Sequence, residues 1–411
     1  MNEPSFNLQQ AQLLDAADEL RHLRARFEMP SDVIYLDGNS LGAMPKRAVG
    51  VLADTASRQW ASDLIRSWND NDWIGAPQRV GGKIAPLIGS GTHEVIVADS
   101  VSVNIFKLLT AICRDRSDCT TILTEAGSFP TDAHVAQGAA DVFELNVELV
   151  ERCDLLGQLN EKTAVLLLSH VHYKSGDRFD MASINAAAKR RGVPVVWDLS
   201  HSTGAVPLDL RRDGTDYAVG CGYKYLNGGP GAPAFVYVSG DRQQTMRSPL
   251  QGWMGHAAPF AFEDDYEPAP GMDRFLVGTP PILSLLALEC GIDEFADIDL
   301  EQVWSKSQSM FDLLASQMAK LCPQLTLITP VDASHRGSHA SFSHPNAWPI
   351  NNALIARGVI GDFRTPDVLR FGLTPLYTRF EDITRAVNIL AEILETEEWC
   401  KPEYSQAARV T

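Results

Sequence analysis

The sequence predicts an α/β protein in which a mainly parallel sheet is covered by helices on both faces and is followed by a smaller α+β unit. From about residue 77 to residue 280, short runs rich in valine and leucine alternate with segments of helical periodicity. Strands that are apolar on both faces and separated by helices are typical of parallel sheets. The chain has 411 residues, of which 45% are hydrophobic, so it can form a large buried core.

The N-terminal part is expected to begin with a helix. Residues 8–29 place leucines and alanines on one side at helical spacing, and Pro30 ends the pattern. A short extended segment at 33–36 and a turn at 37–42 follow. Residues 46–68 are again expected to be helical.

Five short apolar runs are the predicted strands of the sheet. They cover residues 95–98, 121–123, 164–168, 193–197 and 234–238, and helices such as 103–113 and 181–191 lie between most of them. In an open sheet of this kind, ligands bind at the carboxyl ends of the strands. Functional residues are therefore expected directly after these runs.

The pattern changes after residue 280. The sequence there predicts helices to about 297 and at 300–320, strands near 325–329 and 339–343, and further helices near 350–357 and 379–397. We divide the chain into an N-terminal segment that packs with the small domain, a large domain and a small C-terminal domain. Their expected bounds are 1–45, 46–280 and 281–411.

The charge and the cysteines exclude several classes of function. The net charge of −17, from 35 basic and 52 acidic residues, disfavours nucleic acids and anionic membranes as partners. The seven cysteines are scattered and form no CxxC pair, which argues against a metal site and against a disulfide framework. The N-terminus lacks the pattern of a signal peptide, and no apolar run reaches transmembrane length. We expect a soluble, cytoplasmic protein without a bound metal.

An acidic residue and a lysine lie at and beyond the end of one predicted strand. Asp198 and His201 follow the run at 193–197, although such a carboxylate often only caps a turn. Lys224 lies in a glycine-dense stretch with apolar neighbours, which favours burial over the usual exposure of lysine. Burial lowers the pKa of a lysine and frees its amine to attack a carbonyl. The GGPG segment that follows lacks the spacing of a dinucleotide-binding loop.

This combination fits pyridoxal phosphate (PLP). PLP needs a lysine for its aldehyde and an acidic partner for its pyridine nitrogen. Its phosphate needs an anion site, and Ser100 and Ser102 lie at the start of a predicted helix, where free N–H groups favour phosphate. Each serine could otherwise be an ordinary N-cap, so only the combination favours PLP.

Longer segments carry a specific resemblance across nearly the whole chain. They are YLDGNSLG at 35–42, SVNIFKLL at 102–109, FPTD at 129–132, WDLSHSTGAVPLDL at 197–210, YKYLNGGPGAP at 223–233, GWMGH at 252–256, VGTPPIL at 277–283 and LRFGLTPLY at 369–377. In these segments and their order the chain resembles the kynureninase family. The resemblance implies the PLP-dependent fold type I, with a seven-stranded, mainly parallel sheet in the large domain.

The resemblance also implies roles for individual residues. Lys224 would hold PLP as a Schiff base and move the Cα proton, Asp198 would pair with the pyridine nitrogen, and Tyr223 would act as acid or base near Cγ. Arg370 would bind the substrate α-carboxylate, unless it only forms a structural ion pair. The other implied contacts are to PLP for Val101, Ser102, Phe129, Asp132, Ser169, His201, Tyr223, Trp253 and Thr279, and to the substrate for Asn39 and Ser40. Phe129 and Trp253 could instead be simple packing residues.

The implied reaction is the hydrolysis of L-kynurenine to anthranilate and L-alanine, as part of tryptophan catabolism or NAD biosynthesis. Thr279 and the segment around Trp68 favour L-kynurenine over 3-hydroxykynurenine. The resemblance further implies a homodimer, with residues of both subunits near each site. The alternatives are another fold type I enzyme, such as an aminotransferase or a cysteine desulfurase, and a PLP-fold protein without catalysis. A desulfurase needs a mobile nucleophilic cysteine, yet residues 330–344 contain none and Cys322 is a poor substitute.

Overall fold

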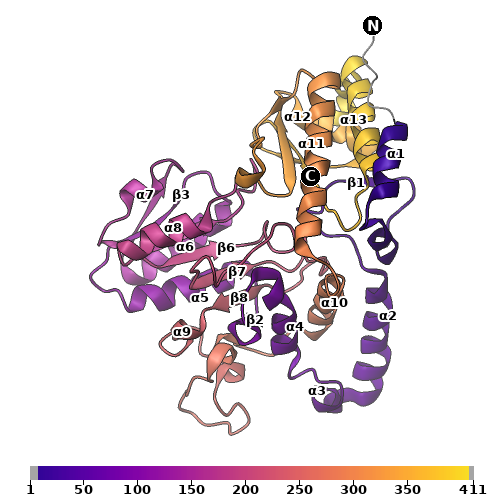
Figure 1. Ribbon diagram of the computed structural model, residues 1–411. Helices are drawn as coiled ribbons and strands as arrows, with labels where there is room; N and C mark the ends of the chain where they lie inside the picture. The colour runs from indigo at the N-terminus through magenta and orange to yellow at the C-terminus, as the bar shows by residue number, and fades with distance from the viewer. Residues whose placement is uncertain (1–7, 407–411) are drawn as a thin grey trace.

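Seven strands form the central sheet of the protein, whose computed structural model describes residues 8–406 (Figure 1). Their order across the sheet is β2-β8-β7-β6-β5-β3-β4. Only β8 runs against its neighbours, β2 and β7, and all other pairs are parallel. The strands are β2 (Val95–Val97), β3 (Thr121–Glu125), β4 (Asn146–Val150), β5 (Thr163–Ser169), β6 (Val195–Asp198), β7 (Tyr217–Gly220) and β8 (Phe235–Val238). The predicted α/β class and mainly parallel sheet are confirmed.

Two of these strands, β4 and β7, were not expected from the sequence. β4 is an edge strand in which no residue is fully buried, so it lacks the continuous apolar run of the inner strands. β7 ends in a glycine and runs directly into the glycine-rich stretch, which interrupts its apolar run. Strands that are exposed, or interrupted in this way, give a weak sequence signal.

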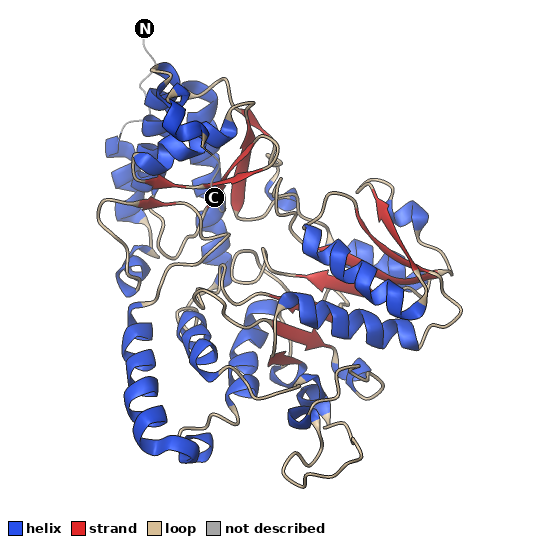
Figure 2. Cartoon of the chain, turned by 180° about the vertical axis from the view of Figure 1, so that it is seen from behind, coloured by secondary structure: helices blue, strands red, loops and turns tan. Residues whose placement is uncertain are grey.

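Both faces of the sheet are covered by helices (Figure 2). Along β5 and β6, Leu166 and Trp197 belong to one buried cluster, while Val165 and Val196 belong to the cluster on the other face. This alternation is the two-residue period of a strand with both faces buried. The helices of this part are α2 (Lys46–Asp54), α3 (Ser67–Asp70), α4 (Ala76–Ile84), α5 (Val101–Arg114), α6 (Pro130–Phe143), α7 (Leu155–Gln158), α8 (Met181–Arg190), α9 (Gly240–Gln243) and α10 (Ile282–Asp293).

The C-terminal part has a four-stranded antiparallel sheet in the order β12-β13-β10-β9, covered by helices. Its elements are α11 (Leu300–Leu321), β9 (Thr326–Leu327), β10 (His339–Ser343), α12 (Ala347–Ala356), β11 (Val359–Ile360), β12 (Asp362–Arg364), β13 (Val368–Gly372) and α13 (Phe380–Glu395). It has its own buried cluster. The expected smaller α+β unit is present.

The N-terminal segment contacts this C-terminal part. Helix α1 (Leu8–Ala17) packs against α13, and β1 (Ile34–Tyr35) pairs in parallel with β11. Helix α10 packs against α2 and α4, although it lies after the expected boundary at residue 281. The division into three parts therefore stays a prediction, with α10 joining the large part by its contacts.

The single helix expected over residues 8–29 is wrong. The chain leaves α1 after Ala17, and a tighter helical turn spans Arg21–Arg26. Asp18 marks the break, because its Oδ1 accepts the N–H of Leu20 at 2.9 Å and its Oδ2 pairs with the Lys306 amine at 2.8 Å. A side chain that takes up backbone N–H groups competes with the helix, and here a distant partner also holds it.

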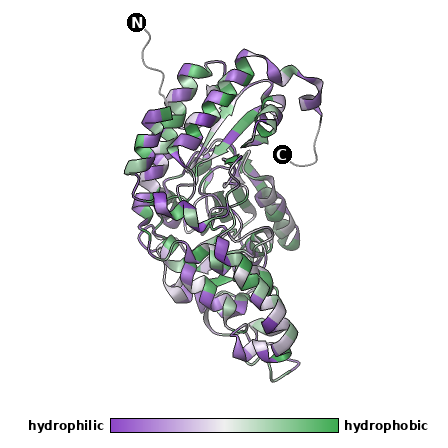
Figure 3. Cartoon of the chain, turned by 90° about the vertical axis from the view of Figure 1, so that its right-hand side faces the viewer, coloured by the Kyte–Doolittle hydropathy of each residue, from purple (hydrophilic) through white to green (hydrophobic). Residues whose placement is uncertain are grey.

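Helix α2 continues as a wider π-helical segment over Thr55–Asp63 and projects from the rest of the chain (Figure 1). Its outer part carries exposed apolar side chains at Trp60, Leu64 and Ile65. Elsewhere the helices alternate between polar and apolar colour around their circumference, as expected for helices with one buried face (Figure 3). Among residues 8–406, no helix combines the length and the apolar character that a membrane crossing requires.

Candidate active site

The carboxyl ends of the parallel strands gather most of the predicted site residues. Ser169 ends β5 and Asp198 ends β6, and the register places these two residues side by side. β2 runs in the same direction as these strands, because it and β7 are both antiparallel to β8. The start of α5, which follows β2, therefore lies at the same edge of the sheet. The topology alone brings the acidic residue and the expected phosphate site to one edge.

Lys224 lies beyond the end of β7 and points toward His201. Its Nζ forms a hydrogen bond with the Nε2 of His201 at 3.2 Å, and the ring centroids of Phe129 and Tyr223 lie 5.8 and 5.9 Å from the same nitrogen. Burial lowers the pKa of the Lys224 amine, and burial also lowers the pKa of His201 well below its usual value. The site therefore favours a neutral amine, which is the form that attacks a carbonyl.

Two buried carboxyl groups lie beside this lysine. The Oδ1 of Asp198 accepts the backbone N–H of Ser200 at 2.8 Å and its hydroxyl at 2.5 Å, and Asp132 Oδ2 accepts the Ser169 hydroxyl at 3.0 Å. Burial raises the pKa of both carboxyl groups, and the charge of Asp198 raises that of Asp132 further. Asp132 Oδ1 is buried and has no hydrogen-bond partner in the described part of the chain. The pair is therefore suited to a protonated nitrogen of a bound ligand, which would stabilise their charge.

The start of α5 leaves backbone donors open. Ser100 is the N-cap, and its hydroxyl accepts the N–H of Val103 at 3.3 Å. No hydrogen bond within residues 8–406 uses the N–H of Val101 or Ser102. Free N–H groups at the start of a 14-residue helix can bind a phosphate. Together with the orphaned oxygen of Asp132 and the free amine of Lys224, these donors fit each end of PLP.

Two residues expected near the phosphate lie at the surface of the single chain. Trp253 is 44% exposed and contacts the ring of Phe260, and Thr279 is exposed. Neither residue contacts the Lys224 cluster through a hydrogen bond or ring contact in the part of the chain that the structure describes. The buried-core alternative for Trp253 is wrong, because nearly half of its surface is open.

The residues expected to bind the substrate, from the N-terminal turn and from β13, lie close together. The Arg370 guanidinium is 1% exposed and bonds to Asp362, to the Ser40 hydroxyl at 3.0 Å and to the carbonyl of Tyr173. Asn39 is fully buried, and neither polar atom of its amide has a hydrogen-bond partner among the residues that the structure describes. Arg370 does form a structural ion pair, and it does so inside the site.

Several residues of this cluster were missed from the sequence. Asp362 holds Arg370 through two carboxylate oxygens, and its pKa is lowered because the bonds to Arg370 outweigh the effect of burial. Burial and the charge of Asp362 raise the pKa of the neighbouring Asp37 to about 7. His339 is fully buried on β10, and its ring lies 5.6 Å from that of His201. The sequence predicted the strand near residues 339–343 but neither β12 nor β13, and a strand pattern does not show which strands pair.

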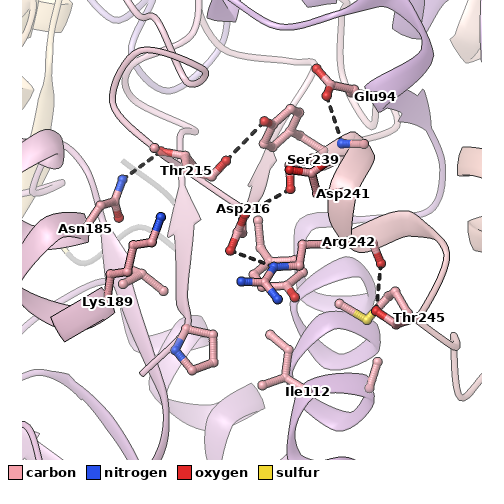
Figure 4. A pocket seen from close by; sticks show the side chains of 18 of the residues that line it. Glu94, Ile112, Asn185, Lys189, Thr215, Asp216, Ser239, Asp241, Arg242 and Thr245 are labelled. Carbon is pink, nitrogen blue, oxygen red and sulfur yellow. Dashed lines mark hydrogen bonds and ion pairs between the residues drawn. The ribbon is translucent and has the colours of Figure 1, made fainter. Parts of the chain in front are cut away.

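A polar cavity of about 1050 Å³ lies at the opposite edge of the sheet (Figure 4). It is formed around the starts of β6 and β7, and it is partly filled by ion pairs such as Arg242–Asp216 and Arg211–Glu94. It contains none of the predicted site residues. The carboxyl edge holds the buried lysine, the acidic pair and the open helix N–H groups, which this cavity lacks. We therefore place the candidate site at Lys224.

Relatives of known name match the chain over nearly its full length. A kynureninase of Burkholderia pseudomallei (strain K96243) is 46% identical over 98% of this chain and 99% of the relative. A kynureninase of Deinococcus radiodurans is 48% identical over 95% of this chain and 97% of the relative. The family model for the kynureninase C-terminal domain matches residues 303–390. The chain belongs to the kynureninase family.

Solved structures with the same fold include cysteine desulfurases. One from Thermococcus onnurineus NA1 has a TM-score of 0.79 at 17% identity and covers 91% of this chain and 98% of that structure. One from Escherichia coli has a TM-score of 0.79 at 19% identity and covers 92% of this chain and 99% of that structure. At this identity the likeness shows the fold of PLP-dependent fold type I enzymes, as expected for a member of the kynureninase family.

Cys322 and Cys221 of this kynureninase family member do not have the surroundings of a reactive thiol. Cys322 is fully buried, and burial raises the pKa of its thiol to about 12. Cys221 lies near Lys224, but it too is buried, and burial raises the pKa of its thiol. A reactive cysteine needs access and a lowered pKa. Neither thiol can serve as the mobile nucleophile of a desulfurase.

Proposed function

We propose that this protein hydrolyses L-kynurenine to anthranilate and L-alanine with PLP as its cofactor. The observation that carries this proposal is 46% identity to a kynureninase over 98% of the chain. The enzyme is accordingly a hydrolase that acts on a carbon–carbon bond of a ketone. The arrangement at the carboxyl edge of the sheet supports the proposal, because it offers a lysine, a buried acidic pair and open helix N–H groups.

PLP is held at three places in this proposal. Lys224 binds its aldehyde, Asp198 pairs with its pyridine nitrogen with Asp132 nearby, and the N–H groups of Val101 and Ser102 bind its phosphate. Other side chains that surround it are those of Phe129, Ser169, His201 and Tyr223, together with Trp253 and Thr279. When bound, PLP accepts the electron pairs released at the substrate Cα and Cβ.

The residues move protons at defined atoms of the substrate. The Lys224 amine removes the proton from Cα, for which its lowered pKa and its contact with the neutral His201 are suited. Water then adds to the γ-carbonyl and the Cβ–Cγ bond breaks, so that the water oxygen leaves in the carboxyl group of anthranilate. Cβ gains a proton, and the Cα proton is returned before L-alanine leaves. Burial raises the pKa of the Tyr223 phenol above its usual value of about 10. Tyr223 thus starts as a proton donor near Cγ and not as a base.

The substrate is bound from the small domain and the N-terminal turn. Arg370 binds the α-carboxylate, and Asn39 and Ser40 approach it from the turn after β1, where the hydroxyl of Ser40 already touches Arg370. Thr279 favours L-kynurenine over 3-hydroxykynurenine in this proposal. The pathway would be tryptophan catabolism or NAD biosynthesis.

A homodimer in the cytoplasm completes the proposal. Trp253 and Thr279 are exposed although both are expected beside the phosphate, which fits a site that a second copy of the chain completes. Trp60 in the π-helical segment and Leu64 and Ile65 directly after it have exposed apolar side chains, which offer a surface for that copy. The cytoplasmic compartment, and the absence of nucleic-acid and membrane partners, stay predictions.

One assay tests the function directly. The purified, PLP-loaded protein is incubated with L-kynurenine, and anthranilate is followed by its fluorescence. Lys224→Ala should abolish turnover and the yellow, borohydride-reducible form, whereas Lys189→Ala, at an exposed lysine by the distant cavity, should leave both unchanged. A yellow wild-type protein that forms no anthranilate would refute the substrate but not the cofactor. Turnover by Lys224→Ala would refute the role of the lysine.

A further inference from the structure

Arg370 cannot bind a carboxylate with two parallel N–H groups while its present bonds persist. Its Nε donates to Asp362 Oδ1 at 2.8 Å, and its Nη2 donates to Asp362 Oδ2 and to the Ser40 hydroxyl. Its Nη1 donates to the Tyr173 carbonyl. A guanidinium has five N–H donors, so these four bonds leave one hydrogen on Nη1. A substrate carboxylate, which accepts several hydrogen bonds, needs further donors at this place.

His339 lies beside Arg370 on the same face of the small-domain sheet. In the antiparallel register, Ser341 of β10 is opposite Arg370 and His339 is opposite Gly372 of β13. Residues opposite one another, and residues two apart on one strand, share a face. The side chains of His339 and Arg370 therefore point to the same side, which is the side of Lys224, since the His339 ring lies 5.6 Å from that of His201.

Within residues 8–406, neither ring nitrogen of His339 has a hydrogen-bond partner, although the side chain is fully buried. The amide of Asn39 is buried and unpartnered in the same way, and it lies directly over Gly372, where a Cβ would meet Asn39 Oδ1 at 2.0 Å. Leaving such groups unpaired costs about 1–3 kcal/mol each, so buried polar groups without partners call for an explanation. The His339 ring and the Asn39 amide lie on one face, beside Arg370 with its one free N–H. Together they indicate that a hydrogen-bond acceptor of a bound ligand belongs at this place.

The groups around His339 favour an acceptor that carries a negative charge. Arg370, His172 and Lys224 lie near His339, and Asp362, which is paired with Arg370 and Arg364, is the acidic group near it. Burial, and next the charge of Arg370, lower the pKa of His339 well below its usual value. The imidazole is therefore neutral, with one N–H to donate and no positive charge of its own to add.

We propose that His339 donates a hydrogen bond to the α-carboxylate of the amino-acid substrate, and that it determines, with the one free N–H of Arg370 and the amide of Asn39, the preference for substrates with that group. The proposal rests on the proposed function, since it takes an α-amino acid as the substrate. In this arrangement Asp362 is a positioning residue that holds Arg370 and occupies two of its N–H donors. His339 and Asn39 supply the further donors that the substrate carboxylate needs.

The test compares two variants of similar size on the PLP-loaded protein. His339→Gln keeps an N–H donor, and His339→Met removes it without opening a large cavity. His335→Ala, at an exposed histidine in the segment before β10, is the control. The ligands are L-alanine and ethylamine, which is the same amine without the carboxylate, and the absorbance of the yellow chromophore reports their dissociation constants.

We expect His339→Met to raise the dissociation constant of L-alanine about 10-fold or more, because a hydrogen bond to a charged group is lost. That of ethylamine should stay unchanged, and His339→Gln should restore most of the affinity for L-alanine. Equal weakening of both ligands, or no weakening of either, would overturn the proposal. Cleavage of L-kynurenine by the wild type is measured separately, so a wrong substrate assignment and a wrong role for His339 give different results.

Discussion

Replacing Asp362 with asparagine should destabilise the protein strongly. The Asp362 side chain is fully buried and bonds to the guanidinium of Arg370, itself 1% exposed, to the Ser40 hydroxyl at 2.6 Å and to Arg364 at 2.8 Å. The substitution removes the only negative charge that bonds to the buried Arg370 among the described residues. Breaking one side of a buried ion pair costs about 3–5 kcal/mol, because the remaining charge stays out of water without a partner.

The measurement is thermal unfolding of the PLP-free protein, since bound cofactor would add its own stabilisation. A loss of about 3–5 kcal/mol corresponds to a fall in Tm of roughly 3–6 °C for a chain of 411 residues. Asp216→Asn is the matched control, because its ion pair with Arg242 is partly exposed and such pairs contribute about 1 kcal/mol or less. If the Tm of Asp362→Asn stays within about 2 °C of the wild type, the cluster does not hold Arg370 as we describe.

Two further predictions concern the phosphate site and a buried histidine. Ser102→Asp, which a helix start tolerates, should weaken PLP binding by at least about 10-fold through charge repulsion, as measured by equilibrium titration of the PLP-free protein; unchanged affinity would place the phosphate elsewhere. Burial lowers the pKa of His170 to about 3, below about 6.5 in an unfolded chain, so its contribution to stability is present above pH 6.5 and is lost as the pH falls. The wild type should therefore lose about 1.4 kcal/mol more than His170→Gln between pH 7.5 and pH 5.5 in urea unfolding of the PLP-free protein, and equal losses in both proteins would contradict a neutral buried His170.

Part of the site could be predicted because its residues follow strand ends in the sequence. Asp198 comes directly after an apolar run, and Ser102 lies at the start of a helix whose periodicity is clear. A parallel sheet places the carboxyl ends of its strands at one edge, so these residues lie close together for any conformation of the loops. The sheet order, which places β8 against its neighbours and β4 at the edge, left no such local pattern.

The site residues that the small domain contributes could not be predicted in this way. His339 and Asp362 take their places through the register of β10, β12 and β13, and the turn at Asn39 reaches them from the other end of the chain. Hydrophobic alternation shows which side of a strand is buried, but not which strand is its neighbour. The surface position of Trp253 was hidden for the same reason, since an aromatic residue fits a core or an interface equally well.

By itself, the sequence determined the α/β class, the lysine and acidic residue at the strand ends, and the family. Only the tertiary structure decided that Asp362 occupies the paired donors of Arg370 and that His339 and Asn39 remain buried without partners beside it. The physical reason is that helix and strand preferences act between near neighbours in the chain. Hydrogen-bond satisfaction in a buried site depends on groups that are more than 300 residues apart, as Asn39 and Arg370 are, and only the packed fold brings them together.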